Sequence, residues 1–310
     1  MLSRIYFAVL VHGLLMASPL QATKAVATPP KSELRVAFSP KRIVNGSACV
    51  FTVRSTKKLR TVHGRWLGHA LEFAAADSGR TWVSIAAAGL NTAPDRYVLE
   101  IQAEPASKGG ALNGRMTIPV ANAKRKTIVL KELTVAEKFT SPDAETLKRI
   151  STEKELKTKV FGEVSAGANW SGKFGLPLDS SITEEFGVRR VFNGSTKSEH
   201  KGVDFRASAG TELIAANRGK VVLARELFYE GNCIVLDHGQ GLLTLYMHMS
   251  RLDVHEGDIV ESGQALGLSG ATGRVTGPHL HMSALWYGMP VDPLTLIALQ
   301  LPSRKTAKIQ

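Results

Sequence analysis

The residues best suited to chemistry lie in the last third of the chain. Six of the nine histidines fall between positions 200 and 281. His279 and His281 are separated by one leucine, so in a strand both imidazoles would project from the same face. Two nitrogen donors side by side suit a metal site. The spacing alone does not decide which of the two histidines would bind the ion.

His200 and Asp204 supply a second set of metal-ligand types, with Gly202 between them permitting the chain to bend. An imidazole and a carboxylate are ligands that zinc takes, and a third ligand from the His279/His281 pair would leave one position for water. Zinc bound in this way lowers the pKa of its water from about 15.7 toward ~7. The residues therefore predict a catalytic zinc centre able to attack peptide bonds.

His248 follows Tyr246 at a spacing of two residues. A strand ending near Ser250 would aim Tyr246 and His248 to one side and the neighbouring apolar residues to the other. The sequence therefore adds a fourth histidine to the predicted site.

Short strands bounded by glycine must position these side chains. The runs 219–223, 233–236 and 243–248 are strand-like, and Asp237–Gly241 has the composition of a hairpin connection. Further glycines mark tight turns at near-regular spacing up to Gly277. We predict an antiparallel, barrel-like β domain over residues 169–300.

Several ordered motifs in this region resemble the lysostaphin-type (LytM-domain) zinc metallopeptidases of bacterial cell walls. The resemblance runs from about Asn169 to Leu296. It rests on His-x-x-x-Asp at His200 and Asp204, Tyr-x-His at Tyr246 and His248, the stretch 273–281, and the segments 186–190, 231–232, 237–239, 257–258 and 291–293.

The resemblance implies a role for each candidate residue. His200, Asp204 and His281 would bind one zinc ion per chain, His279 would act as general base on the water, and His248 would stabilise the developing oxyanion or transfer protons. No motif position is lost, which favours an active enzyme. The implied function is a secreted zinc metalloendopeptidase that hydrolyses cross-links or stem peptides of peptidoglycan.

A non-catalytic alternative remains open at this point. Some relatives that have lost zinc ligands activate other wall hydrolases, so a wall-binding activator is the second hypothesis. The bond cleaved is also open, because D-Ala to diaminopimelate, Gly-Gly and other linkages all suit the same chemistry.

Residues 34–130 have a different pattern, in which short alternating runs such as 49–53, 81–85 and 97–101 are separated by turn-rich segments. Period-two alternation without a long helical pattern predicts a β-sandwich, which looks immunoglobulin-like. His63 and His69 have no partners at useful spacing and are predicted to be structural or surface residues. The fold class expected for the whole chain is mainly β.

Residues 131–168 are predicted to be a partly helical linker, because Ser141-Pro142-Asp143 is a helix start signal. Residues 301–310 are predicted to be a disordered tail. Between positions 23 and 165 the sequence holds 24 basic and 13 acidic residues, whereas positions 166–310 hold 14 of each. The basic half is either a solvated face or a site for an anionic envelope surface. Clustered aromatics are missing, so nucleic acid is not expected as a partner.

The first 22 residues resemble a secretory signal peptide, with Arg4 before an apolar run too short to span a bilayer. The protein is therefore expected in the periplasm or associated with the cell envelope, without a transmembrane segment. Of 310 residues 44% are hydrophobic and 21% charged, which excludes a fully disordered chain. Cys49 and Cys233 are expected to be small buried hydrophobes, and no disulfide framework is expected.

Overall fold

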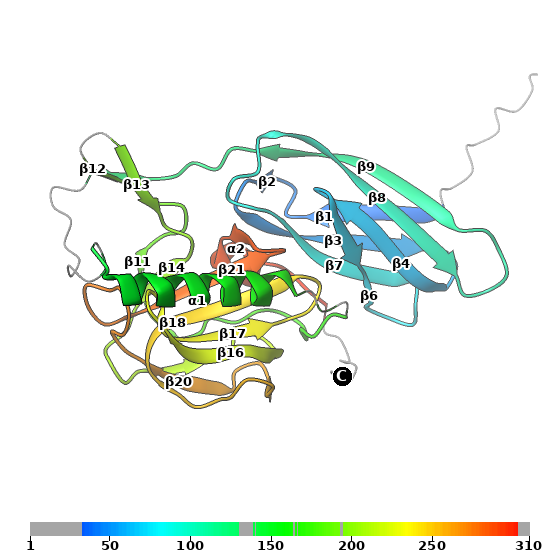
Figure 1. Cartoon of the computed structure of the whole chain (residues 1–310). Helices are drawn as coiled ribbons and strands as arrows, with labels where there is room; N and C mark the ends of the chain where they lie inside the picture. Colours follow the sequence, from blue (N-terminus) through cyan, green and yellow to red (C-terminus); the bar gives the residue numbers. More distant parts are fainter. Residues whose placement is uncertain are drawn as a thin grey trace, which may run out of the picture. The chain divides into compact units, whose positions relative to one another are not determined.

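The computed structural model describes residues 33–129, 139, 141–163, 165, 167–192 and 195–302 (Figure 1). The described residues, from 33 to 302, belong to one compact unit. The predicted signal peptide and most of the predicted tail lie outside the described residues. Within those residues no helix is both long enough and apolar enough to cross a membrane.

Two sheets make up the N-terminal part, and every strand pair in them is antiparallel except β2 with β9. The first sheet has the order β1 (Leu34–Ser39), β3 (Ser47–Ser55), β7 (Thr81–Ala88) and β6 (Ala74–Ala75). The second has the order β2 (Ile43–Val44), β9 (Leu112–Ala121), β8 (Asp95–Pro105), β4 (Leu59–Trp66) and β5 (His69–Glu72).

Buried aromatic side chains join these two sheets. Phe51 of β3 meets Trp66 of β4 edge to face, with ring centroids 5.2 Å apart. The indole N–H of Trp66 donates to the carbonyl of Ala87 in β7 at 2.9 Å. The alternation in the sequence thus serves to place one face of each strand in a shared core. The mainly-β class is confirmed, while the immunoglobulin-like assignment remains a prediction.

A ten-stranded sheet carries Asp204, His248, His279 and His281, and all of its strand pairs are antiparallel. Its main path runs β11 (Ile182–Glu184), β14 (Val203–Arg206), β21 (His279–Trp286), β18 (Leu242–Leu252), β17 (Gly231–Asp237), β16 (Gly219–Leu227) and β19 (Ile259–Val260). The strands β15 (Glu212–Ile214), β20 (Ala265–Ser269) and β22 (Met289–Val291) attach beside that path. The strands predicted at 219–223, 233–236 and 243–248 are confirmed, since they lie within β16, β17 and β18.

Smaller elements complete the described fold. A three-stranded sheet joins β10 (Thr127–Val129), β12 (Arg189–Phe192) and β13 (Ser195–Glu199). The short helix α2 (Pro293–Ile297) follows β22.

The long helix α1 (Ala144–Gly162) begins at the helix start signal read from the sequence. The carboxylate of Asp143 accepts the backbone N–H of Thr146 at 2.8 Å and caps the helix. Leu156, Val160 and Phe161 pack on a buried apolar cluster formed by β16, β17, β18 and β21. Figure 1 shows the helix lying along these strands, so its apolar stripe explains why it stays on the sheet.

Candidate metal centre and adjoining histidines

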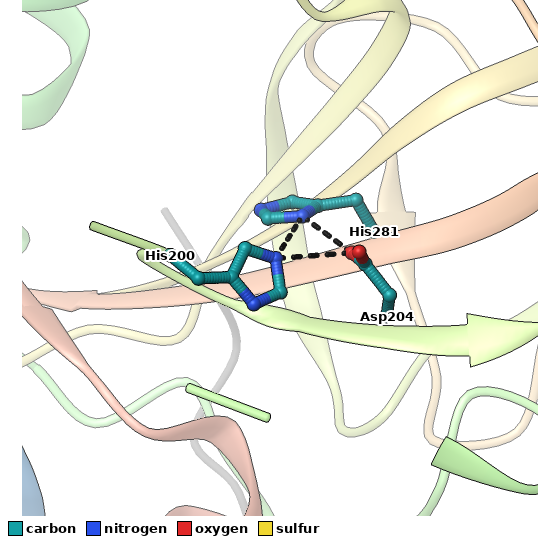
Figure 2. Close-up of side chains that lie close together, drawn as sticks. All are labelled: His200, Asp204 and His281. Atoms are coloured by element: carbon teal, nitrogen blue, oxygen red, sulfur yellow. Dashed lines mark hydrogen bonds and ion pairs between the residues drawn. The ribbon is translucent and has the colours of Figure 1, made fainter. Parts of the chain in front are cut away.

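Three side chains from β14, β21 and the turn before β14 converge on one point (Figure 2). In the β14–β21 register Asp204 lies opposite His281. Nε2 of His200 is 3.1 Å from Oδ1 of Asp204 and 3.1 Å from Nδ1 of His281, and that Nδ1 is 2.8 Å from the same carboxylate oxygen. Tetrahedral zinc with ligand bonds of about 2.0–2.1 Å separates its ligand atoms by roughly 3.3 Å. The three distances between the ligand atoms here are close to that separation.

The outward ring nitrogens of both histidines are occupied by hydrogen bonds that fix the tautomer. Nδ1 of His200 donates to the carbonyl of Glu185 at 2.8 Å. The Ser283 hydroxyl gives its proton to the carbonyl of Lys201 at 3.0 Å, so it accepts from Nε2 of His281 at 2.9 Å. Each ring therefore turns its other nitrogen toward Asp204, and that nitrogen is a lone-pair donor whenever it carries no proton. Two imidazole lone pairs and a carboxylate are a donor set that fits a divalent metal ion.

The charges within this cluster are strongly coupled. Burial by itself raises the pKa of Asp204, but hydrogen bonds and charge from His200 and His281 outweigh it and hold the pKa well below its usual range. Burial lowers the pKa of His281. Burial by itself lowers the pKa of His200, but Asp204, with smaller contributions from Glu185 and Glu184, outweighs it, and the pKa is raised. Asp204 is thus ionised at neutral pH, and a metal ion would displace the proton that His200 attracts.

His248 and His279 form a second pair beside the first. Their ring centroids are 5.0 Å apart, and the centroid of His248 is 6.0 Å from that of His281. Nδ1 of His279 donates to the carbonyl of Gly277 at 2.9 Å, and Nδ1 of His248 donates to the carbonyl of Thr272 at 2.9 Å. In the neutral form of either ring, Nε2 is therefore the nitrogen that accepts a hydrogen bond or a proton.

Burial lowers the pKa of His248 to about 4, with a smaller contribution from the neighbouring histidines. This histidine is accordingly neutral at pH 7. Nε2 of His279 lies 3.7 Å from Oδ1 of Asp204. The structure therefore groups all five predicted residues, with three converging on one point and two lying beside it.

At His248 the backbone differs from the regular extended strand that the sequence predicted. His248 has a φ of +64°, which an extended strand does not allow. Tyr246 is fully buried, and its hydroxyl accepts the N–H of Ala216 at 2.8 Å. Strand phase alone therefore does not set the direction of His248.

The remaining histidines of the domain lie outside the cluster. His238 is buried, with Nδ1 bonded to the carbonyl of Arg218 and Nε2 to the hydroxyl of Thr244. The side chain of His255 is 92% exposed. Asp237 accepts hydrogen bonds from the hydroxyl of Ser165 and from the N–H of Gly239. These bonds fix the turn that follows β17.

Two supporting residues were not anticipated from the sequence. Ser283 continues the spacing of His279 and His281 on the same strand face, so period two was a signal that could have identified it. Thr272, whose carbonyl holds His248, has no such local signal.

Comparison with known proteins gives matches in the same region. A model of peptidase family M23 matches residues 198–293. The peptidoglycan DD-endopeptidase ShyA of Vibrio cholerae is 38% identical over 138 residues, which cover 43% of this chain and 32% of ShyA. The chain thus spans about a third of the length of that relative.

Two solved structures extend the comparison. An M23 peptidase candidate from Pseudomonas aeruginosa is 27% identical with a TM-score of 0.61, covering 83% of this chain and 95% of that one. The catalytic domain of the antimicrobial peptidase lysostaphin from Staphylococcus simulans is 34% identical with a TM-score of 0.35, covering 38% of this chain and 92% of that one.

Proposed function

The chain belongs to peptidase family M23 through residues 198–293, and on that premise we propose that it is a secreted zinc metalloendopeptidase that hydrolyses peptide bonds of peptidoglycan. One observation carries the proposal. Three protein ligand atoms converge beside two histidines whose Nδ1 atoms donate to backbone carbonyls, so that Nε2 of either neutral ring can accept a proton. A purely structural zinc site has four protein ligands, whereas three ligands leave a position for chemistry.

His200, Asp204 and His281 would hold the zinc ion. When bound there, zinc supplies Lewis-acid chemistry that acidifies water and polarises a carbonyl group. The hydrogen bonds of His200 to Glu185 and of His281 to Ser283 keep the donor nitrogens pointed inward. These partners therefore preorganise the centre before the ion arrives.

His279 is proposed as the general base. Its Nδ1 proton is committed to Gly277, so Nε2 takes a proton from the attacking water and then passes it to the leaving amine. His248 has the same tautomer and, being neutral, accepts a hydrogen bond at Nε2 from water or from a substrate N–H. To donate a hydrogen bond to the developing oxyanion, His248 would first have to take up a proton at Nε2.

Peptidoglycan as the substrate rests on the relatives. ShyA is named a peptidoglycan DD-endopeptidase, which favours a cross-link or stem peptide of peptidoglycan as the target here. Such a substrate would place the protein in the periplasm or on the cell envelope. The basic excess of the N-terminal half would help to hold it near an anionic envelope surface.

The test is digestion of purified sacculi with the zinc-loaded protein, followed by mass spectrometry of the released fragments. New free amines without new reducing sugar ends are expected. Activity should vanish with a chelator, return with zinc, and fall by about 10²–10⁴-fold in His279→Ala, the usual contribution of general acid–base catalysis. His255→Ala, which changes an exposed histidine, is the matched control.

The second candidate, a non-catalytic activator of other wall hydrolases, predicts a different result. His279→Ala would then support cell separation as well as the unmutated protein does, and neither protein would release fragments from sacculi. That pair of results would overturn the enzymatic proposal.

A further inference from the structure

His248 has a backbone conformation that needs external support. Its φ of +64° is uncommon for a residue with a side chain. Its backbone N–H donates to the carbonyl of Glu230 at 2.9 Å, and its ring donates to the carbonyl of Thr272 at 2.9 Å. Both acceptors are backbone atoms, so the position of His248 depends on where those two stretches of chain lie.

The two stretches are in direct backbone contact with each other. Glu230 lies at the tip of the β16–β17 hairpin, and Thr272 lies in the segment between β20 and β21. The N–H of Arg274 donates to the carbonyl of Tyr229 at 2.9 Å. A Cβ on Gly273 would lie 2.6 Å from that carbonyl oxygen and 2.8 Å from the carbonyl carbon of Glu230. These contacts are between backbone atoms, so a shift of the hairpin tip would also move Thr272.

From its other side the hairpin tip is held by helix α1. Nζ of Lys157 lies 2.5 Å from Oε1 of Glu230, and the two side chains are only 22% and 17% exposed. The carboxylate of Glu153 accepts the backbone N–H of Phe228 at 2.8 Å. The helix thus contacts the tip through the Lys157–Glu230 pair, the Glu153–Phe228 bond and the guanidinium of Arg149, which lies over the Phe228 ring.

The Lys157–Glu230 pair is more constrained than an ordinary surface ion pair. Among the described residues, Oε2 of Glu230 is buried without a hydrogen-bond partner. Lys157 therefore provides the compensating charge for a largely desolvated carboxylate. Without it, Glu230 would move toward water, and its backbone carbonyl would move with it.

The helix itself does not depend on this pair to remain on the sheet. Leu156, Val160 and Phe161 dock it on the apolar cluster over β16, β17 and β18, along which Figure 1 shows it lying. A variant at position 157 should therefore leave α1 in place.

We propose that Lys157 and Glu230 are positioning residues for His248, so that a helix preceding the M23 segment fixes a side chain of the active site. The inference rests on the proposed role of His248. Lys157 lies outside the matched residues 198–293, and its effect is transmitted through the hairpin tip. Neither residue is among the three side chains that would hold the metal ion.

The first test compares Lys157→Met with Lys159→Met in the full zinc-loaded chain. Lys159 is on the same helix, with a 76% exposed side chain 4.0 Å from Glu163. Lys157→Met is expected to lower kcat at least tenfold, to change KM less than twofold and to retain one zinc per chain. Lys159→Met and Lys157→Arg are expected to match the unmutated protein.

A second readout does not depend on activity. The Nδ1 proton of His248 is hydrogen-bonded to Thr272, so it should give a slowly exchanging imidazole resonance in the NMR spectrum, which is expected to broaden or vanish in Lys157→Met alone. The double variant Lys157→Met, Glu230→Met removes the uncompensated charge and should recover the resonance and most of kcat.

The outcomes separate this inference from the proposed function. If His248→Ala is inactive while Lys157→Met keeps full kcat and an unchanged resonance, the positioning role is refuted and the peptidase remains. If Lys157→Met only lowers the unfolding temperature, with kcat unchanged below it, the pair is structural and the inference fails. An unmutated protein that is inactive on sacculi would instead overturn the proposed function, and the resonance would still test the positioning.

Discussion

His200 and His281 are separated by 81 positions in the chain, yet Nε2 of one faces Nδ1 of the other at 3.1 Å. Two unprotonated nitrogens at that distance repel each other unless a cation or a shared proton lies near them. Asp204 provides the negative charge that attracts such a cation. The arrangement therefore calls for a proton, which His200 attracts, or for a bound ion in its place.

Zinc should accordingly stabilise the folded protein. At a zinc concentration a thousandfold above Kd, the free energy of unfolding is expected to rise by about 4 kcal/mol. Asp204→Asn should lose most of this increase, because the remaining ligands are neutral. Thermal unfolding with and without zinc measures the effect, with the exposed Asp179→Asn as control. An equal zinc-dependent rise in both variants would contradict the ligand assignment.

Ser283→Ala should weaken metal binding without removing a ligand. The Ser283 hydroxyl accepts from Nε2 of His281 and so keeps Nδ1 unprotonated. Loss of such a partner typically costs 10–100-fold in metal affinity. Competition with a chromophoric chelator measures the zinc Kd of the variant. An unchanged Kd would mean that the tautomer of His281 is fixed in another way.

Gly202→Ala should damage the centre by steric contact. A Cβ at this position would lie 2.5 Å from Nε2 of His281 and 2.7 Å from the Ser283 hydroxyl oxygen. We expect a loss of zinc affinity of at least tenfold with the β fold retained in circular dichroism. Gly175→Ala is the control, since its Cβ would meet only a carbonyl oxygen at 3.8 Å. Normal zinc binding by Gly202→Ala would show that β14 can shift to admit a methyl group.

Acid should destabilise the domain partly through His238. Burial lowers the pKa of His238 from its ordinary value of 6.5 to about 4, so the unfolded chain binds the proton more readily. The contribution of neutral His238 to the free energy of unfolding is fully present above pH 6.5 and is lost as the pH falls toward 4. The loss is on the order of 3 kcal/mol, at 1.36 kcal/mol for each unit of pKa.

Urea unfolding at pH 7.0 and pH 4.5 checks this expectation. His238→Gln should be less stable than the unmutated protein at neutral pH and should lose less stability on acidification. Equal losses in the two proteins would remove His238 as the source.

Local sequence patterns were sufficient for the elements but not for the contacts between them. The alternation of apolar residues predicted β strands because one face of each is buried, and Ser141-Pro142-Asp143 predicted the start of α1 because its carboxylate caps the first turn. Both features depend on near neighbours. The resemblance in motifs likewise identified the family, because ligand types recur at short, fixed spacings.

By itself, the sequence determined that His279 and His281 share a strand face and that His200 and Asp204 are close neighbours in the chain. Only the tertiary structure decided that Asp204 meets His281 at 2.8 Å while Nε2 of His279 remains 3.7 Å away. The same is true of the contact between Lys157 and Glu230. Strand periodicity fixes the direction of a side chain, whereas the register between distant strands and the docking of a helix depend on packing across the whole domain.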